Sequence, residues 1–571
     1  MLAVRERVPG SPDRPRRGAA PLLLVLALCA VAPLHFFETF PNGWDQTEYA
    51  WCIKAGFLPH SPYVLFVFLG RGLAWVFPPA VALSLLSFAS SIGALVFLYL
   101  AVLHLTVTHP SGDRPAGGPA TVAHVTDWAE AGGARAAALV AVLLLGTSTV
   151  FVRHAGTQEV YAFQLCLVLA CAAVLTSASP WRHALGGLIY GGALAAHNAS
   201  WFVLPALLVL VVARPGGGGR ARAVAVWLGA AGATLAVAYG ITGLLLPVEP
   251  GGRLRELLVY LRGMPPGLAP GTVLAPGFLA ESAAGIGRRL VDGGIELTRG
   301  PLATGPVGLS VLHFAVAALG LARLVARGRA LAGALFLASW ALPFLVYEWM
   351  LGWNLDYGTY LVFVLPPVCA ACGCAVGWLG GLGRVPRLAV GAGVVLALVA
   401  PSGLQLRRHW DDTARDRRRH DSATTLAAVF AARALPEDAV VVQPRSEWNA
   451  NLLPFHAERR HIARIGTQLK LFRSPARWTP MKPDAYTPLT TEALEQLLRA
   501  GIPVIAFEQE PLRGANPGVL DPSRFVWRPA GAADLAAGAA ALGLPAAPLE
   551  RFPQPFLEMY RAALAAPNRE R

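Results

Sequence analysis

AVALSLLSFASSIGALVFLYLAVLH is the sequence of residues 80–104, a segment without a single Asp, Glu, Lys or Arg. It is longer than the roughly 20 apolar residues that an α-helix needs to cross a bilayer. The whole chain has the same character, because 55% of its 571 residues are hydrophobic and only 14% are charged. An ordinary soluble domain has about 25% charged residues. This surplus of apolar residues predicts an α-helical polytopic membrane protein and excludes a disordered chain or a secreted disulfide scaffold.

Apolar segments of this kind recur along most of the chain, and we predict eleven transmembrane helices from them. The segments are Pro21–Phe37, Ala80–His104, Ala134–Phe151, Val160–Ala178, Ala184–Ala196, Trp201–Ala213, Ala223–Leu246, Val307–Ala326, Ala330–Glu348, Gly358–Gly380 and Leu388–Gly403. The fifth and sixth are short, and His197 and Asn198 separate them. These two could be tilted half-spans that meet at a polar break.

Arginines predict the orientation of these segments. Five arginines precede the first segment, which has no good cleavage site after it, so we interpret it as an uncleaved anchor. The positive-inside rule then places the N-terminus in the cytoplasm. Alternation from there puts the arginines of the later basic loops inside as well. We therefore predict a multi-pass cell (inner) membrane protein, with residues 1–20 as a cytoplasmic tail and residues 21–403 as the membrane domain.

Two features fit this topology less well. Pro62–Phe77 is a further apolar run, interrupted by a glycine-arginine-glycine sequence. If it crossed the membrane, every later loop would change sides, so we predict an interfacial or re-entrant helix. Six arginines between residues 407 and 419 follow the last segment on the predicted outer side. Either one crossing is miscounted, or a membrane-surface helix leads into a translocated domain.

The composition changes after about residue 404. Ala423–Ala434 and Thr491–Ala500 have helical patterns, whereas Ala439–Gln443 and Pro503–Glu508 are short apolar runs typical of buried strands. Their alternation predicts a small α/β soluble domain over residues 404–571, on the extracytoplasmic side. It contains no glycine-rich fingerprint for nucleotides.

The net charge of +14 and the cysteines have ordinary explanations. Almost all the positive charge is arginine, which is typical of a codon preference combined with basic cytoplasmic loops, and no aromatic-interleaved basic face indicates nucleic-acid binding. Cys369, Cys372 and Cys374 have the spacing of a metal cluster. They lie in a predicted span without a second ligand pair, so small apolar packing explains them better.

The first predicted outside loop, residues 38–79, carries the most informative polar residues. Asp45 and Glu48 are three residues apart, so on a helix both carboxylates would project from one face. A carboxylate there could act as a general base or bind a cation. The alternative is a pair of solvated loop acids. His60 follows between two prolines, and Tyr63 comes just before an apolar helix.

A second polar cluster joins the third and fourth predicted spans and contains Arg153, His154, Glu159 and Tyr161. Ionisable groups at the edge of a bilayer are costly, so they tend to face protein or a wet cavity. An arginine there suits a phosphate, because its guanidinium donates two hydrogen bonds at once. The alternative is that Arg153 extends toward lipid head groups.

Two smaller candidates lie at the same predicted depth. His197 and Asn198 interrupt apolar sequence, and taken alone they are more simply a satisfied polar pair than a site. Asp356 is a third acid, in the last predicted outside loop.

These elements, in this order, resemble the bacterial protein O-mannosyltransferase-like family of the GT-C superfamily. The family has an acid pair in its first outside loop and then a histidine- and proline-containing stretch that enters a helix, similar to Asp45, Glu48 and residues 56–63. Glu159-Val160-Tyr161 resembles a signature at the start of a span, and residues 190–198 resemble a small-residue helix that ends in a polar pair. The resemblance covers residues 20–215 well and residues 340–380 loosely. Ser61 and the Gln46-Thr47 pair depart from the pattern.

The resemblance implies a membrane glycosyltransferase that moves a sugar from a polyprenyl-phosphate donor to a protein or glycan acceptor at the outer face of the membrane. Asp45 would be the base of an inverting displacement, and Glu48 would orient the acceptor or share a divalent cation. Arg153, His154 or His60 would stabilise the leaving phosphate. Glu159 and Tyr161 would hold the sugar or brace their loop.

Two other classes of function remain open at this point. A transporter or flippase for a lipid-linked or small anionic substrate would also need many spans, interfacial arginines and broken helices. Such a protein concentrates its polar residues at mid-depth, whereas here they lie at the outside ends of the spans. The third class is a membrane scaffold whose outer domain binds a partner.

Overall fold

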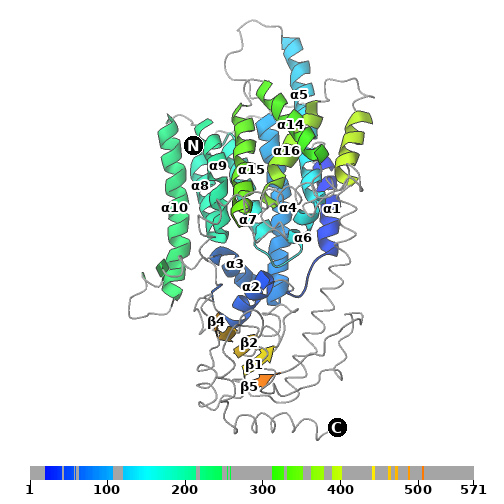
Figure 1. Ribbon diagram of the computed structural model, residues 1–571. Coiled ribbons are helices and arrows are strands. Elements are labelled where there is room, and N and C mark those ends of the chain that lie inside the picture. Colours follow the sequence, from blue (N-terminus) through cyan, green and yellow to red (C-terminus); the bar gives the residue numbers. More distant parts are fainter. Residues whose placement is uncertain are drawn as a thin grey trace, which may run out of the picture.

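The computed structural model describes the chain over residues 20–41, 44–56, 58–59, 63–106, 120–213, 219–246, 311–326, 331–351, 362–378 and 389–400, at positions 254, 257 and 258, and in five short strands. Within these limits the protein is mostly helical, and Figure 1 shows the long helices side by side in a bundle. The elements are α1 (Ala20–His35), α2 (Trp44–Ala55), α3 (Val64–Leu73), α4 (Pro79–Thr106), α5 (Ala120–Thr147), α6 (Thr149–Ala155), α7 (Tyr161–Thr176), α8 (Arg182–Ala196), the 3₁₀ helix η2 (Asn198–Val203), α9 (Leu204–Ala213), α10 (Gly219–Leu245), α14 (Val311–Ala326), α15 (Leu331–Leu351) and α16 (Leu365–Trp378).

A helix overlaps each of the eleven predicted segments, the last being the apolar helix Ala389–Ala400. By length and composition, α4 and α10 can each cross a membrane, and α5 with α6 can form a third, bent span. The other apolar helices are shorter. The coarse prediction of a helical protein with membrane-crossing segments therefore holds in the described part of the chain.

The third predicted span differs from the structure. Ala134–Phe151 was expected to be one helix, but the chain bends by 71° between α5 and α6. Ser148, at the bend, has an extended backbone with φ −66° and ψ 129°, so it interrupts the helix. The bend turns α6 away from the axis of α5, and α6 packs against α4 and α7.

The first predicted outside loop contains two helices, α2 and α3. Both lie at one end of the bundle, close to the start of α4 (Figure 1). α3 falls inside the run Pro62–Phe77, for which we predicted an interfacial or re-entrant helix, and it is too short to cross a bilayer by itself. The segment with the acid pair is therefore folded against the membrane domain.

Small residues allow α8 and α10 to pack closely against each other. A Cβ atom added to Gly187 of α8 would lie 2.2 Å from the backbone oxygen of Trp227 on α10, and one added to Gly191 would lie 2.5 Å from that of Ala231. Only glycine allows the two backbones to approach so closely. The Trp227 ring is itself buried and stacks on Tyr190 at a centroid distance of 4.9 Å.

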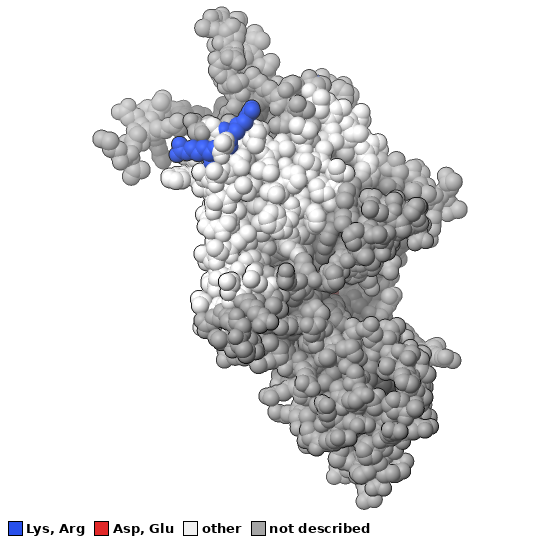
Figure 2. Space-filling view, turned by 60° about the vertical axis from the view of Figure 1, so that its left-hand side comes forward, with Lys and Arg blue, Asp and Glu red and all other residues white. Residues whose placement is uncertain are grey.

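The outer surface of α10 is apolar along its length. Its exposed large side chains include Val226, Leu228, Val237, Ile241 and Leu244. Figure 2 shows this side of the molecule as an uncharged surface with blue atoms only near one rim. The charged residues of α10 are Arg220 and Arg222, both exposed in its first turn. Such a surface fits lipid chains, with the arginines at one membrane boundary.

The C-terminal part of the chain contributes a five-stranded sheet in the order β4-β3-β2-β1-β5. The strands are β1 (Val440–Gln443), β2 (His461–Arg464), β3 (Lys470–Arg473), β4 (Tyr486–Pro488) and β5 (Val504–Ala506). β1 pairs in parallel with β2 and β5, whereas the β2–β3 and β3–β4 pairs are antiparallel. The two predicted strands are thus β1 and β5, which are direct neighbours. The predicted helices Ala423–Ala434 and Thr491–Ala500 lie outside the described residues.

Candidate functional site

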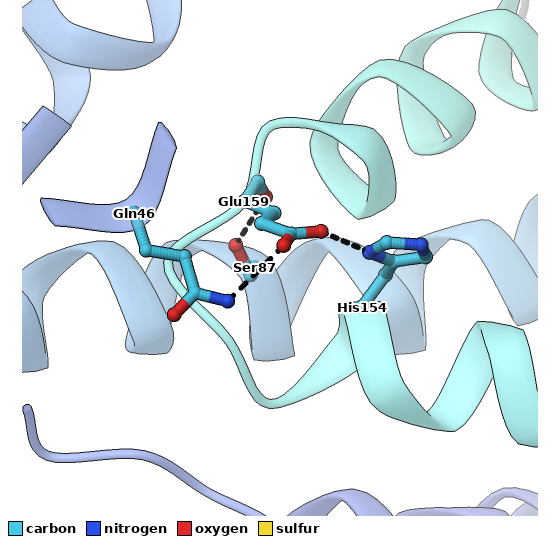
Figure 3. Close-up of polar contacts among 4 residues, drawn as sticks. All are labelled: Gln46, Ser87, His154 and Glu159. Atoms are coloured by element: carbon cyan, nitrogen blue, oxygen red, sulfur yellow. Dashed lines mark hydrogen bonds and ion pairs between the residues drawn. The ribbon is translucent and has the colours of Figure 1, made fainter. Parts of the chain in front are cut away.

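The loop between α6 and α7 contains a glutamate that contacts three other elements. Gln46 of α2 donates a hydrogen bond from Nε2 to Glu159 Oε1 over 3.1 Å, and His154 of α6 pairs through Nδ1 with the other carboxylate oxygen. Ser87 of α4 donates to the backbone oxygen of Glu159 over 3.0 Å. Figure 3 shows these three side chains around Glu159. Because both carboxylate oxygens are engaged, Glu159 is better suited to brace the site than to act as a free base.

The partners of Glu159 keep it ionised. Burial by itself raises the pKa of the Glu159 carboxyl, but other effects outweigh it. The charge and hydrogen bond of His154, the charge of Arg153 and the hydrogen bond from Gln46 lower this pKa from 4.5 to about 2. Arg153 itself is exposed, so its guanidinium can meet a ligand while its charge acts on the loop.

A row of aromatic rings continues from this pair across the end of the bundle. His154 meets Tyr161 edge-on with a centroid distance of 5.0 Å, and Tyr161 lies 5.5 Å from His197. His197 in turn stacks on Tyr63 at 4.1 Å with the ring planes 19° apart. Four predicted site residues, from three separate stretches of sequence, therefore lie in one continuous row.

His197 is held in one protonation state. Its Nδ1 accepts a hydrogen bond over 3.0 Å from the backbone N–H of Ala199, and the side chain thereby caps η2. Burial lowers the pKa of His197 to about 3. The neutral ring then carries its hydrogen on Nε2, since Nδ1 is an acceptor. His197 can therefore donate a hydrogen bond, but it does not supply a positive charge near neutral pH.

Buried hydrogen bonds fix the break that carries His197. Gln164 of α7 donates from Nε2 to the hydroxyl of Ser200 over 2.9 Å, and that hydroxyl donates to the backbone oxygen of Ala193 over 2.9 Å. The hydroxyl of Tyr190 donates to the backbone oxygen of Ser200 over 3.1 Å. The prediction of a polar break between α8 and α9 is thus correct, and the break is a rigid one.

A second set of hydrogen bonds ties the α6–α7 loop to the end of α1. Gln158 donates from Nε2 to the backbone oxygen of Glu38 over 2.9 Å and to the hydroxyl of Ser84 over 2.6 Å. The backbone N–H of Glu38 donates a hydrogen bond to the backbone oxygen of Gly156 over 3.0 Å. A Cβ atom on Gly156 would lie 3.0 Å from the backbone oxygens of Pro33 and Phe36. The loop is therefore held from both sides.

The predicted acid pair lies on α2. Asp45 is in the first turn of this helix, and its side chain is outside the described part of the structure. Glu48 is only 1% exposed, so the alternative of a solvated loop acid is wrong for this residue. Gln46, between the two acids, links their helix to Glu159. The acid pair and the aromatic row thus belong to the same end of the bundle.

The remaining predicted residues have mixed outcomes. Asn198 is half-buried and begins η2, next to His197. His60 and Asp356 lie outside the described residues, so their relation to the site stays a prediction.

Sequence reasoning missed the polar residues that fasten the site together, namely Gln46, Ser87, Ser84 and Gln158. A signal was present for the serines. Ser84, Ser87 and Ser91 recur at intervals of three and four residues in a helix without charged residues, which places them on one face. All three are buried, and the first two bond to the loops at the site.

The described residues contain no cluster of three or more His, Cys, Asp and Glu side chains that could hold a metal ion. Cys369 and Cys372 of α16 are buried, Cys374 is half-buried, and none of the three forms a disulfide. Cys372 donates a hydrogen bond to the backbone oxygen of His313 over 3.2 Å, which agrees with packing as its role.

Comparison with models of known protein families gave no match, and no curated protein matched the chain either. The function therefore has to be argued from the geometry of this end of the bundle.

Proposed function

We propose that the protein is a membrane glycosyltransferase that moves a sugar from a polyprenyl-phosphate donor to an acceptor hydroxyl of a protein or glycan. The observation that supports this proposal most is the convergence at the site. Residues predicted from three distant motifs, represented by Tyr63, Glu159 and His197, lie in one connected cluster at the end of the bundle that also holds the acid pair on α2.

The proposed reaction is a single displacement. The Asp45 carboxylate accepts the proton of the acceptor hydroxyl while that oxygen forms a bond to the anomeric carbon of the sugar. The bond between the anomeric carbon and the phosphate oxygen breaks on the opposite face, and the polyprenyl phosphate leaves with the electron pair. One displacement of this kind inverts the configuration. A positioned carboxylate base contributes about 10²- to 10⁴-fold to such a step.

The neighbouring side chains have complementary roles in this proposal. Arg153 is exposed and positively charged, so it suits the leaving phosphate. His154 pairs with Glu159 and holds this carboxylate in place. His197 is fully buried and stacks on Tyr63, so this pair of rings supports the residues around it. Glu159 braces the loop, since both of its carboxylate oxygens are already engaged.

A divalent cation is an optional part of the proposal. Asp45 and Glu48 are the carboxylates that would hold it. Two side chains are fewer than the set of oxygen ligands that Mg²⁺ or Ca²⁺ requires, so donor phosphate or water would have to supply the rest. In the absence of a cation, the exposed Arg153 would bind the phosphate directly.

The topology that we propose has eleven crossings. The N-terminus is cytoplasmic, and the site and a C-terminal α/β domain over residues 404–571 lie outside. The position of the arginines supports this arrangement, because Arg182, Arg220 and Arg222 all begin helices whose far ends lead toward the site or its end of the bundle. An alkaline phosphatase fused after residue 403 should be active in intact cells, and an inactive fusion would contradict the proposed side of the domain.

The reaction can be tested with the purified protein in nanodiscs. The wild type and the Asp45→Asn variant are incubated with radiolabelled polyprenyl-phosphate sugars and cell-envelope extract, and label that leaves the lipid is counted. Lys54→Gln, a change at an exposed position on the same helix, is the matched control. We expect transfer by the wild type and the control, and a loss of about 10²- to 10⁴-fold in the Asp45→Asn variant.

Two other outcomes would change the proposal. Equal transfer by all three proteins would keep the reaction class and remove Asp45 from its role as base. Failure of the wild type to transfer any of the sugars, together with movement of labelled lipid across the bilayer, would support the transporter. The polar cluster at one end of the bundle argues against that alternative, since transporters bind near mid-membrane.

A further inference from the structure

The turn between α3 and α4, residues 74–78, carries a group of exposed apolar side chains. Trp75 is 89% exposed, Val76 is 77% exposed and Phe77 is 39% exposed. No charged residue occurs from the start of this turn to the end of α4. A compact apolar group of this kind is costly in water, and it marks a surface that meets another molecule or a membrane.

Backbone hydrogen bonds hold this turn in place. The N–H groups of Val76 and Phe77 donate to the backbone oxygen of Leu73 over 3.0 and 3.1 Å, so the turn continues directly from the end of α3. α3 itself is fixed by Gly70, where an added Cβ would lie 2.5 Å from the Leu83 side chain and 2.8 Å from that of Ile53. The turn is thus rigidly connected to both α2 and α4.

The turn lies directly before a helix that can cross a membrane. α4 has 28 residues, which corresponds to about 42 Å at a rise of 1.5 Å per residue. The hydrocarbon core of a bilayer is about 30 Å thick. The first residues of α4, and the turn before them, therefore lie at or near a membrane boundary.

Exposed tryptophans mark two such boundaries. Trp201, in η2, is 55% exposed, and Trp181, which precedes the basic start of α8, is 73% exposed. The 15 residues of α8, about 22 Å at a rise of 1.5 Å per residue, lie between these two tryptophans, so each lies near one end of this helix. Tryptophan is enriched at both membrane interfaces, and arginine on the cytoplasmic side, so Trp181 marks the inner boundary and Trp201 the outer one.

We propose that the α3–α4 turn is inserted into the outer membrane interface, with Trp75, Val76 and Phe77 among the lipid head groups and upper acyl chains. The indole ring of tryptophan combines a large apolar surface with one hydrogen-bond donor, so it prefers this layer to water or to the bilayer centre. The partner of this surface is the lipid bilayer.

The insertion of this turn fixes the position of the site relative to the membrane surface. Because Gly70 packs α3 against Ile53 of α2 and Leu83 of α4, the inserted turn holds the helix with Asp45 and Glu48 at the level of the head groups. This inference rests on the membrane crossing of α4 and holds whether or not the protein transfers sugars.

Depth-dependent quenching tests the proposal. A thiol-reactive fluorophore is attached to the Trp75→Cys variant in nanodiscs of phosphatidylcholine and phosphatidylglycerol. Lipids that carry a nitroxide quench the fluorescence of a label that lies within the bilayer. Iodide quenches the fluorescence of a label that is exposed to water. Lys54→Cys, at an exposed position of α2, is the matched control, and the wild type measures labelling of the native cysteines.

We expect a nitroxide near the head group to remove most of the fluorescence of the label at position 75, and iodide to have little effect there. Iodide should quench the label at position 54 strongly, because this position faces water. Iodide quenching at position 75 as strong as at position 54 would overturn the proposal. Protection from both quenchers would also overturn it, because a second copy or another protein would then cover the turn. The substitution is at an exposed position, so folding should be unaffected.

Discussion

α4 and α10 are both long and apolar enough to cross a membrane, yet they have different environments. Half of the apolar stretch of α4 is buried inside the protein, against 11% for α10. α4 is surrounded by α1, α3, α5 and α7, whereas α10 packs mainly on α8 and exposes the rest of its surface.

The difference lies in what the polar residues of each helix contact. On α4, the hydroxyls of Ser84 and Ser87 donate hydrogen bonds to the backbone oxygens of Glu38 and Glu159. These bonds connect α4 to two other segments of the chain. On α10, Thr234 bonds to the backbone of Ala230 in its own helix. Hydropathy is therefore a measure of whether a helix can enter a membrane, and the partners of its few polar groups show whether it faces protein or lipid.

Removal of the glutamate beside α4 should have the largest effect on stability. Glu159→Ala leaves the side chains of His154 and Gln46 without the carboxylate that they contact. Breaking a buried ion pair from one side costs about 3–5 kcal/mol. Reversible unfolding in mixed micelles would measure the loss. Arg220→Gln on α10, at an exposed position, should change the free energy of unfolding by no more than about 0.5 kcal/mol. An equal decrease in the free energy of unfolding for the two variants would contradict the difference between α4 and α10.

The close contact between α8 and α10 should give the next largest effect. Gly187→Val places a side chain where the backbone oxygen of Trp227 lies, and overpacking of this kind costs about 1–3 kcal/mol. The same substitution at Gly232, on the open side of α10 with nothing within 4 Å, is the control and should be tolerated. Size-exclusion profiles after heating would compare the two variants. A stable Gly187→Val protein would show that α8 and α10 are not tightly packed.

A smaller effect should separate the serines of α4 from the threonine of α10. Ser87→Ala removes a bond between two elements and should cost about 0.5–1.5 kcal/mol. Thr234→Ala removes only a bond within its own helix and should cost less. Melting temperatures of the two purified variants would rank them. The reverse order would mean that α10 carries structural contacts that its exposure does not suggest.

Acid should weaken the α4 side without any substitution. The pKa of Glu159 is lower in the folded protein, about 2, than its usual 4.5, so folding favours the ionised form. This stabilisation is complete above a pH of about 4.5 and is lost as the pH falls toward 2. The melting temperature of the wild type should therefore fall more steeply below a pH of about 4.5 than that of Glu159→Gln. If the melting temperatures of the two proteins fell equally with pH, the lowered pKa of Glu159 would be contradicted.

Several features of the fold were predictable because they are local. Helices overlap every apolar segment predicted from the sequence, and the short apolar runs around Val441 and Ile505 are neighbouring strands. The polar break at His197 was also predicted correctly. Each of these depends on residues close together in the chain. The bend at Ser148 was missed, because its extended backbone lies within an apolar run that would suit a continuous helix.

The site was predictable only in part. The sequence indicated His154, Glu159, Tyr161 and His197 as polar groups at the edge of the membrane, since such groups are costly unless they have partners. The partners themselves were not predictable. Gln46 and Glu159 are 113 residues apart, and nothing local in either segment identifies the other.

The sequence by itself determined that this protein is helical, that it has segments able to cross a membrane and that its polar residues gather at the ends of those segments. These are consequences of apolar content and periodicity, which act along a single helix. Only the tertiary structure decided that α4 lies in the interior and α10 at the surface, and that Glu159 is a brace with both oxygens engaged. Such assignments depend on which helices pack together, because a hydrogen bond between distant segments forms only where the backbones bring its two atoms within reach.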